Sequence, residues 1–121
     1  MPEHRQSPRT RRVADRIMVE LAEILTTKTE DPRLRVLSVT GADVSRDLAS
    51  ARVWISGARS KDEEPAILKA LQHAAPYFRT LLAPRLKLRV VPELRFEIDR
   101  SFETGSRIET LLRELREPRD E

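Results

Sequence analysis

The sequence of 121 residues contains no cysteine, only three glycines and only two histidines. Without cysteine, the chain forms neither a disulfide framework nor a thiolate metal site, which fits a reducing cytoplasm. His4 and His73 are too few and too scattered for a histidine-based zinc site. The sequence also lacks a P-loop, a glycine-rich phosphate cradle and a Ser/His/Asp or Cys/His set. We therefore expect a binding protein rather than an enzyme, with no metal and no cofactor.

Long apolar runs are absent as well. No stretch approaches the roughly 20 apolar residues of a membrane span, and residues 1–12 lack the apolar core of a secretory signal. Hydrophobic residues make up 39% of the chain, enough for one core at this length. We expect a single cytoplasmic domain that does not act at a membrane.

Lysine is scarce, whereas arginine is abundant. Of the 23 basic residues only four are lysines, so 19 are arginines. The planar guanidinium binds phosphate oxygens through two parallel hydrogen bonds, which suits RNA or DNA. A genome whose base composition favours arginine codons would explain much of the total count. The local clustering is more informative, because residues 1–16 hold five arginines but only Glu3 and Asp15 as acids: Arg5, Arg9, Arg11, Arg12 and Arg16.

The hydrophobic periodicity predicts an α+β domain with its helices on one face of a sheet. We expect a mobile basic arm over 1–10, one domain over 11–116 and a tail over 117–121. The expected elements are a helix from Val13 to about Lys28 that Asp31-Pro32 ends, strands over 36–44 and 49–56 joined by a turn at 45–47, a broken helix from about 62 to 82, a strand over 88–99 and a helix from Ser106 to near Pro118.

The second and third strands show a clear alternation of side chains. Ala51, Val53 and Ile55 share one face of the second strand, and Trp54 lies on the other. The short link to the preceding strand predicts a hairpin. In the third strand the inward residues are Leu94, Phe96 and Ile98, and Pro92 marks its beginning or an edge bulge.

Ala74-Ala75-Pro76 interrupts the long helical pattern. Apolar residues recur on both sides of it at steps of three and four: Ile67, Leu71, Ala74, Phe78 and Leu81. Pro76 cannot donate a backbone N–H and disfavours the helical conformation at Ala75, so the helix must stop or kink. A new helix beginning at Pro76 would offer free N–H groups to a phosphate. The alternative interpretation is a tight helix crossing without a ligand.

The segment after this proline is basic. Arg79, Arg85, Lys87 and Arg89 lie between Tyr77 and Val91 with no acid among them. We expect them, together with the arginines of the first helix, to neutralise nucleic-acid phosphates. An ordinary solvated face is the alternative.

Three further features have open interpretations. Trp54 would stack on a base or be covered by a neighbouring element. Asp31, Asp43 and Asp47 suggest a hard-cation site, although turn and helix-cap roles explain them more simply. His73 is expected to be a surface residue.

The order of elements is that of a type II K-homology domain, α-β-β-α(kink)α-β with a short C-terminal helix. From about Arg9 to Leu115 the chain also resembles bacterial ribosome-binding factor A. The stretches that carry the resemblance are Arg12-Val13-Ala14-Asp15-Arg16-Ile17, Asp31-Pro32-Arg33-Leu34, Val39-Thr40, Val44-Ser45-Arg46-Asp47-Leu48, Arg79-Thr80-Leu81-Leu82, Leu88-Arg89 and Pro92-Glu93-Leu94 leading to Phe96 and Asp99.

The resemblance implies a non-catalytic factor that binds the immature 30S ribosomal subunit and assists late maturation and processing of its 16S rRNA. It implies 16S rRNA in the free 30S subunit as the partner of a monomer, with no small-molecule substrate. In that family a kink of the pattern Ala-x-Gly replaces the usual GxxG loop. Ala74 matches the alanine, whereas Pro76 occupies the glycine position, so an N–H at Pro76 cannot contact phosphate. The expected RNA-binding residues are Arg9, Arg11, Arg12, Arg16, Ala74, Ala75, Arg79, Arg85, Lys87 and Arg89.

Two other function classes remain open from the sequence. One is a protein-interaction adaptor whose sheet edge or C-terminal helix docks a partner. The other is a small-molecule regulatory domain of similar shape, for which the sequence shows no convergent polar set.

Overall fold

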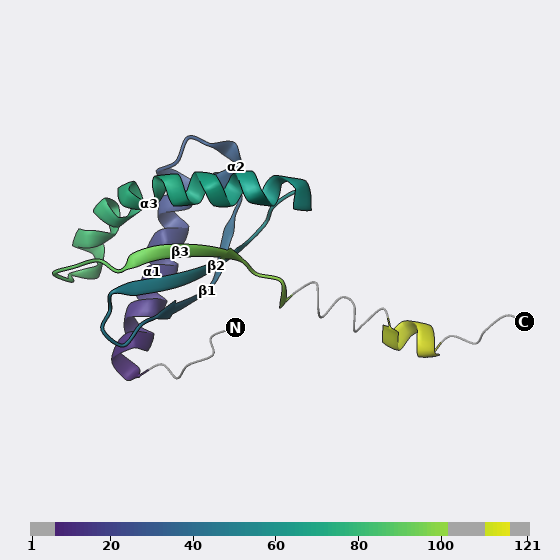
Figure 1. The fold of residues 1–121 in the computed structure, drawn as a ribbon, viewed down its shortest axis with the longest axis horizontal. Helices are drawn as coiled ribbons and strands as arrows, with labels where there is room; N and C mark the ends of the chain where they lie inside the picture. Colours follow the sequence, from purple (N-terminus) through teal and green to yellow (C-terminus); the bar gives the residue numbers. More distant parts are fainter. Residues whose placement is uncertain (1–6, 102–110, 117–121) are drawn as a thin grey trace, which may run out of the picture.

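The computed structural model describes residues 7–101 and 111–116. Its elements, in chain order, are α1 (Pro8–Thr27), α2 (Pro32–Arg35), β1 (Ser38–Val44), β2 (Ser50–Ser56), the 3-10 helix η1 (Lys61–Glu63), α3 (Glu64–Leu86) and β3 (Glu93–Ile98). Helix α1 contacts β1, α3 contacts β3, and the two helices contact each other (Figure 1). Apart from the two short helices α2 and η1, these elements follow the expected α+β order. No helix in the described ranges has a stretch long and apolar enough to cross a membrane.

The sheet has the strand order β1-β2-β3. β1 and β2 are antiparallel and form the predicted hairpin, with Val53 opposite Ala42. β3 is parallel to β2, with Phe96 opposite Val53, because the long crossover through α3 returns the chain in the same direction. β3 begins at Glu93, directly after Pro92, rather than at Leu88 as expected. β1 begins at Ser38 rather than at Val36, because α2 occupies the residues before it.

The core lies between the sheet and the two long helices. Phe78 of α3 meets Phe96 of β3 edge to face, with ring centroids 6.2 Å apart. Ala51, Val53 and Ile55 of β2 are all buried, as their alternation predicts. Helix α1 contributes a buried stripe at steps of three and four: Ala14, Ile17, Leu21, Ile24 and Leu25.

Helix α1 begins earlier than the sequence pattern indicated, whereas its end at Thr27, with Lys28 as the C-cap, agrees with the expected end near Lys28. The Ser7 side chain accepts a hydrogen bond from the Thr10 amide and caps the helix, and Pro8 occupies its first turn. The helix therefore begins inside the segment 1–10 that we expected to be an arm, and residues 1–6 lie outside the described residues. At the other end, Asp31-Pro32 does not end α1. Instead, the Asp31 carboxylate caps α2, a short helix that the pattern did not predict.

Helix α3 passes through Pro76 without ending. It bends along its length, the first half and the second half pointing in different directions in Figure 1. A proline inside a helix removes one hydrogen bond and crowds the preceding turn, which explains the bend. The buried stripe keeps its phase across the bend: Ile67, Leu71, Ala75, Phe78 and Leu82. Our expectation of a second helix beginning at Pro76 was wrong. Ala74 and Leu81, which we expected in the buried stripe, are partly buried and pack against the core, and its fully buried positions are taken by Ala75 and Leu82.

Of the segment in which we expected a C-terminal helix, the structure describes only residues 111–116. Residues 111–116 are helical and exposed, with Leu111, Leu112 and Leu115 among the large apolar side chains open to solvent. The expected capping box at Ser106 and the end near Pro118 lie outside the described residues.

Candidate nucleic-acid interface

The first half of α1 and the end of α3 enclose a hollow of about 380 Å³. The second half of α3 runs back toward the start of α1, so residues near the start of α1 meet residues near the end of α3 (Figure 1). The lining contains four cations and two apolar side chains: Arg12, Val13 and Arg16 from α1, and Arg85, Leu86 and Lys87 at the end of α3. We call this hollow and its lining the basic groove. It brings together residues that are about 70 positions apart in the sequence.

Exposed cations line the groove side of α1 and continue to the start of that helix. Arg12 and Arg16 are four residues apart on one face of α1, and both are exposed. Arg9 and Arg11 extend the exposed cations to the first turn of α1, which carries no acid. The positive end of the helix dipole disfavours cations at that position. The dipole of α1 therefore does not account for the presence of Arg9 and Arg11 at its start.

Lys87 lies where α3 ends. Its backbone is left-handed, with φ of 55°, and its amide donates to the Ala83 carbonyl. A cation at a helix C-terminus is favoured by the dipole, so Lys87 stabilises the end of α3 while its side chain lines the basic groove. Arg89 follows in the loop before β3 and is exposed.

Arg85 is the most enclosed of the four cations. Its Nη1 lies 3.4 Å from Glu20 Oε1 and 3.3 Å from Glu23 Oε1, and its side chain is largely buried. Arg16 Nη2 lies 3.6 Å from the other oxygen of Glu20. One carboxylate therefore contacts two of the groove arginines, on two different helices. Neither Glu20 nor Glu23 was among the expected site residues, although the four-residue spacing of Arg16 and Glu20 signals a helical ion pair.

Arg79 does not lie in the basic groove. Its Nη2 donates to the Val91 carbonyl at 2.8 Å, and its Nε is buried without a hydrogen-bond partner among the described residues. The guanidinium thus holds the loop before β3 against α3, where the side chain is half-buried. The structure gives Arg79 a structural contact in place of the free phosphate-facing guanidinium that we expected.

The bend of α3 is separated from these cations. Ala75 is 4% exposed and belongs to the core, and it precedes Leu86 by a helical rise of about 16 Å. Ala74 is half-buried and lines a different hollow of about 440 Å³. Its lining contains charges of both signs, Lys28, Glu30 and Asp31, beside His73, Leu34, Ala70, Tyr77 and Phe78. The structure therefore brings together Arg12, Arg16, Arg85 and Lys87 but leaves Ala74 and Ala75 apart from them.

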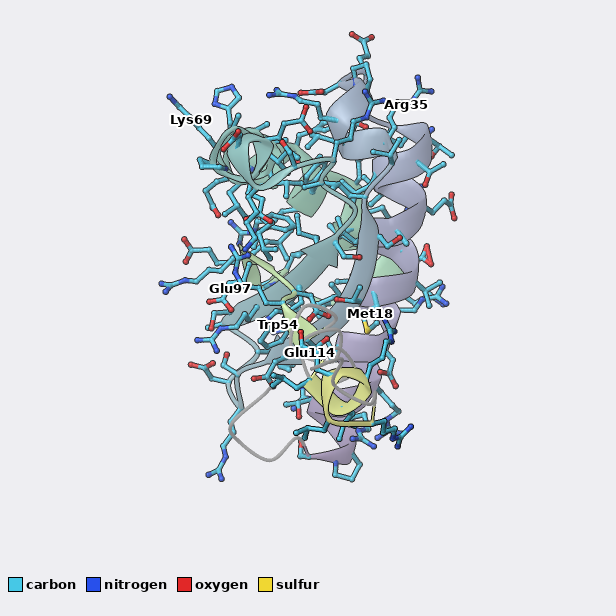
Figure 2. The ribbon with its side chains drawn as sticks, turned by 90° about the vertical axis from the view of Figure 1, so that its right-hand side faces the viewer. Met18, Arg35, Trp54, Lys69, Glu97 and Glu114 are labelled. Carbon is cyan, nitrogen blue, oxygen red and sulfur yellow. The ribbon has the colours of Figure 1, made fainter. Side chains whose placement is uncertain are left out.

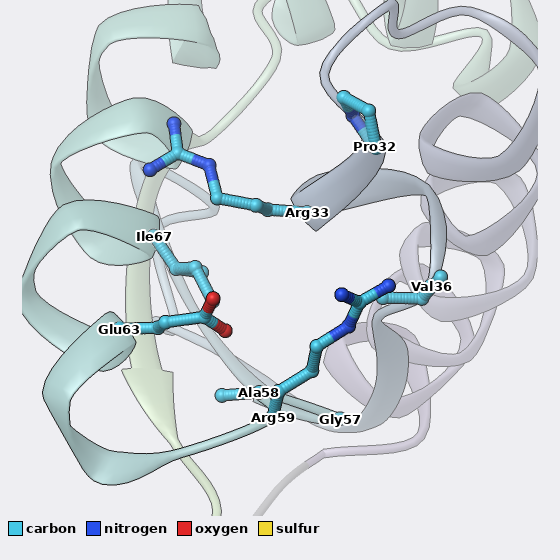
Figure 3. A pocket seen from close by; sticks show the side chains of 8 residues that line it. All are labelled: Pro32, Arg33, Val36, Gly57, Ala58, Arg59, Glu63 and Ile67. Carbon is cyan, nitrogen blue, oxygen red and sulfur yellow. The ribbon is translucent and has the colours of Figure 1, made fainter.

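A third, smaller pocket of about 70 Å³ also carries arginines (Figure 3). Arg33 and Arg59 line it together with Glu63. Arg33 is already bound, since its Nε and Nη2 donate to the Asp31 carboxylate at 3.1 and 2.7 Å. A lining of mixed charge around so small a volume does not suit a nucleic-acid backbone.

Two of the three aspartates that suggested a cation site, Asp31 and Asp47, serve local structure. The Asp47 carboxylate accepts hydrogen bonds from the Ser45 hydroxyl and the Ala49 amide, which lower its pKa, and the Arg33 side chain lowers the pKa of Asp31. Within the described ranges, His, Asp and Glu form no group of three or more that would hold a metal ion. His73 is exposed, as expected.

Trp54 is 8% exposed on the outer face of the sheet (Figure 2). Its ring packs against Gly41, where an added Cβ would lie 3.4 Å from Trp54 Cε3, and the Arg52 guanidinium lies 5.7 Å from the ring centroid. Its burial and the neighbouring Arg52 leave little of the Trp54 ring accessible to a nucleobase. Coverage by neighbouring parts of the protein therefore describes Trp54 better than stacking on a base.

Comparisons with known proteins agree with the resemblance. The family model described as ribosome-binding factor A matches residues 9–112. A ribosome-binding factor A of Alkalilimnicola ehrlichii is 43% identical over 111 residues, covering 91% of this chain and 85% of that protein. One from Thermomicrobium roseum is 41% identical over 119 residues, covering 98% of this chain and 89% of its own length.

Solved structures show the same fold. The crystal structure of ribosome-binding factor A from Thermus thermophilus superposes with a TM-score of 0.66 at 28% identity, covering 76% of this chain and 98% of that one. A Thermus thermophilus homology model fitted into a cryo-EM map of a complex with the 30S subunit superposes with a TM-score of 0.60 at 30% identity, covering 72% and 91%. The expected K-homology-like fold is confirmed, and the chain belongs to the ribosome-binding factor A family.

Proposed function

We propose that this protein binds the 30S ribosomal subunit and contacts the phosphate backbone of 16S rRNA through the basic groove. A related chain has been placed in a 30S complex, which supports the choice of partner. The groove supports the choice of surface, because four cations converge there from two helices. This convergence is the observation that carries the proposal.

The chemistry of the basic groove suits phosphates rather than base edges. Guanidinium and ammonium groups donate charge-assisted hydrogen bonds to phosphate oxygens. The flanking Arg9, Arg11 and Arg89 extend the cationic surface beyond the groove. Phosphate contacts position a protein on RNA but do not read its sequence, so we expect recognition of a folded backbone shape.

Binding of this kind assists maturation without catalysis. A protein that binds one conformation of the rRNA more tightly than another shifts the equilibrium toward the first, and the shift is limited only by the difference in affinity. We propose that this chain acts in the cytoplasm as a monomer in this way, favouring a conformation reached late in 30S maturation and 16S rRNA processing. This role needs no cofactor and no small-molecule substrate.

Sedimentation with purified 30S subunits over a salt titration tests the proposal. Four phosphate contacts predict that affinity falls about 50- to 150-fold between about 50 and about 200 mM monovalent salt. Replacing Arg12 and Lys87 by glutamine should remove two of these contacts and weaken binding at every salt concentration. Binding that is independent of salt, or equal for the wild type and the double variant, would overturn the proposal.

The exposed apolar residues of the C-terminal helix favour a second candidate, an adaptor that docks a partner protein. Leu111, Leu112 and Leu115 are 58%, 45% and 80% exposed. Association through these leucines should survive nuclease treatment and moderate salt, whereas association through rRNA should not. Substitution of the three leucines by serine separates the two functions, since only the adaptor depends on them.

A further inference from the structure

We propose that Glu20 is a positioning residue, which holds Arg16 and Arg85 in the orientation that lets both meet phosphate in the basic groove. The inference rests on the proposed function, since it concerns how that groove is prepared for RNA. It assigns a role to an acid within a cationic surface, where net charge alone would predict that an acid is harmful.

The contacts of Glu20 carry the inference. Its carboxylate is shared, one oxygen lying 3.4 Å from Arg85 Nη1 and the other 3.6 Å from Arg16 Nη2. The two arginines belong to different helices, so Glu20 ties the first half of α1 to the end of α3. The Glu20 side chain is only 12% exposed, whereas the two arginines line the hollow and Glu20 does not. The acid therefore lies behind the cations.

Glu23 provides a natural comparison one turn along α1. It contacts Arg85 Nη1 at 3.3 Å, and its side chain is 56% exposed. An acid as exposed as Glu23 contributes little to the position of Arg85, because water screens the pair and the Glu23 side chain stays mobile. Arg85 keeps its contact with Glu20 when Glu23 is changed, but Arg16 and Arg85 lose their shared partner when Glu20 is changed.

Preorganisation explains why a buried acid would favour an anionic ligand. An arginine side chain loses rotamer freedom when it is fixed on a phosphate, and this loss opposes binding. Where an acid already restricts the guanidinium, the arginine has lost this rotamer freedom during folding, so RNA binding does not have to restrict it again. Five N–H donors on each guanidinium leave enough to bind phosphate while Glu20 occupies one.

The test compares Glu20→Gln with Glu23→Gln in salt-dependent binding to purified 30S subunits. Both variants remove one negative charge from the same face of α1, so a purely electrostatic account predicts that both tighten binding. The positioning account predicts that Glu20→Gln weakens binding about three- to tenfold, the effect of ordering one or two arginine side chains, whereas Glu23→Gln leaves it unchanged or tighter. Tighter binding by both variants would overturn the inference.

A variant with a second change separates positioning from a general structural effect. In an Arg16→Gln/Arg85→Gln background, Glu20→Gln should produce no further loss of affinity, because Glu20 acts through these two arginines. A further loss of the same size in that background would contradict the inference. Should Glu20→Gln lower the melting temperature, Glu20→Asp keeps the charge but shortens its reach, and it too should weaken binding.

Failure of the proposed function gives a different result. If the basic groove does not contact RNA, the Arg12→Gln/Lys87→Gln variant binds like the wild type. This result would overturn both the proposed role of the groove and the inference about Glu20. If that variant binds weakly while Glu20→Gln does not, the groove stands and only the inference about Glu20 is overturned.

Discussion

The bend of α3 and the end of α3 belong to one continuous helix but have opposite characters. At the bend, Ala75 is buried and the adjoining hollow is lined by charges of both signs. At the end, Arg85 and Lys87 join Arg12 and Arg16 around a cationic groove. The bend therefore sets the path of α3 along the core, whereas the end of α3 contributes cations to the basic groove. A break in a helical pattern marks a change in the path of the chain, but the ligand surface lies where charge converges in three dimensions.

Charge reversal at the two places gives the largest expected difference. Arg12→Glu with Lys87→Glu should weaken binding to 30S subunits on the order of 100-fold, since each lost charge-assisted contact is worth about 1.5 kcal/mol. Lys28→Glu with Lys69→Glu makes the same change of charge outside the groove. Lys28 lines the hollow beside the bend, and Figure 2 shows Lys69 pointing outward from the first half of α3. We expect less than about a threefold effect from this control pair, because neither lysine lines the groove. Equal losses from both pairs, measured by filter binding, would show that only net charge matters.

Arg79 and Arg89 should respond in opposite ways. Arg79→Ala removes the donor to the Val91 carbonyl and should lower the free energy of unfolding by about 1 to 3 kcal/mol. Arg89→Ala removes an exposed side chain and should change it by less than about 0.5 kcal/mol while weakening 30S binding. Urea unfolding and 30S binding, measured on both variants, test whether Arg79 contributes to stability and Arg89 to binding. An Arg79 variant of full stability that fails to bind RNA would restore Arg79 to the interface.

Replacing the proline of the bend should affect stability rather than binding. Pro76→Ala restores a backbone donor inside α3, and a helix-interior proline costs up to about 3 kcal/mol. The buried stripe continues in phase across the bend, from Ala75 to Phe78, so packing keeps the path of the helix. We expect the free energy of unfolding to be unchanged or higher and the affinity for 30S subunits to stay within about twofold of the wild type. A tenfold loss of affinity would place the bend in the interface.

The smallest effect concerns Asp99, just after β3. The Thr40 hydroxyl donates to its carboxylate at 2.6 Å and the Ser101 amide at 2.8 Å, and these hydrogen bonds lower the pKa of Asp99. Since the folded pKa lies below the unfolded one, the stabilisation is present above about pH 4 and is lost as the pH falls through the folded value.

Asp99→Asn should therefore lower stability by about 0.5 to 1 kcal/mol at neutral pH, and the difference from the wild type should shrink toward about pH 3. Denaturant unfolding across this range provides the measurement, and 30S binding at neutral pH should not change. A difference that grows toward acid pH would contradict the assigned cause.

Much of the fold was accessible from the sequence because its signals are local. The alternation of Ala51, Val53 and Ile55 and the stripe from Ile17 to Leu25 each report one buried face of one element. α2 was missed because four residues show no periodicity, and the Asp31-Pro32 pair that caps it looks the same as a helix stop. The start of α1 was misplaced because Ser7 and Pro8 are typical of a loop as well as of a helix N-terminus.

The candidate site was less accessible, because burial and partners are properties of the folded chain. Arg79 and Arg89 look alike in an acid-free run, yet one donates to a backbone carbonyl and the other is exposed. The acids that contact Arg85, Glu20 and Glu23, come from a helix more than 60 positions earlier, so no local pattern reveals them. A sequence run shows how many charges are present, whereas only the structure shows which of them converge.

Site-directed crosslinking to 16S rRNA tests the central claim most directly, because a chain without cysteine accepts single cysteines without interference. Three exposed positions form a matched set: Val90 beside the end of α3 at 69% exposure, Tyr77 at the bend at 50%, and Val36 after α2 at 54%. With a short photo-crosslinker on each cysteine variant in complex with 30S subunits, we expect rRNA crosslinks mainly from Val90→Cys. Crosslinks from Tyr77→Cys in the absence of any from Val90→Cys would contradict the account.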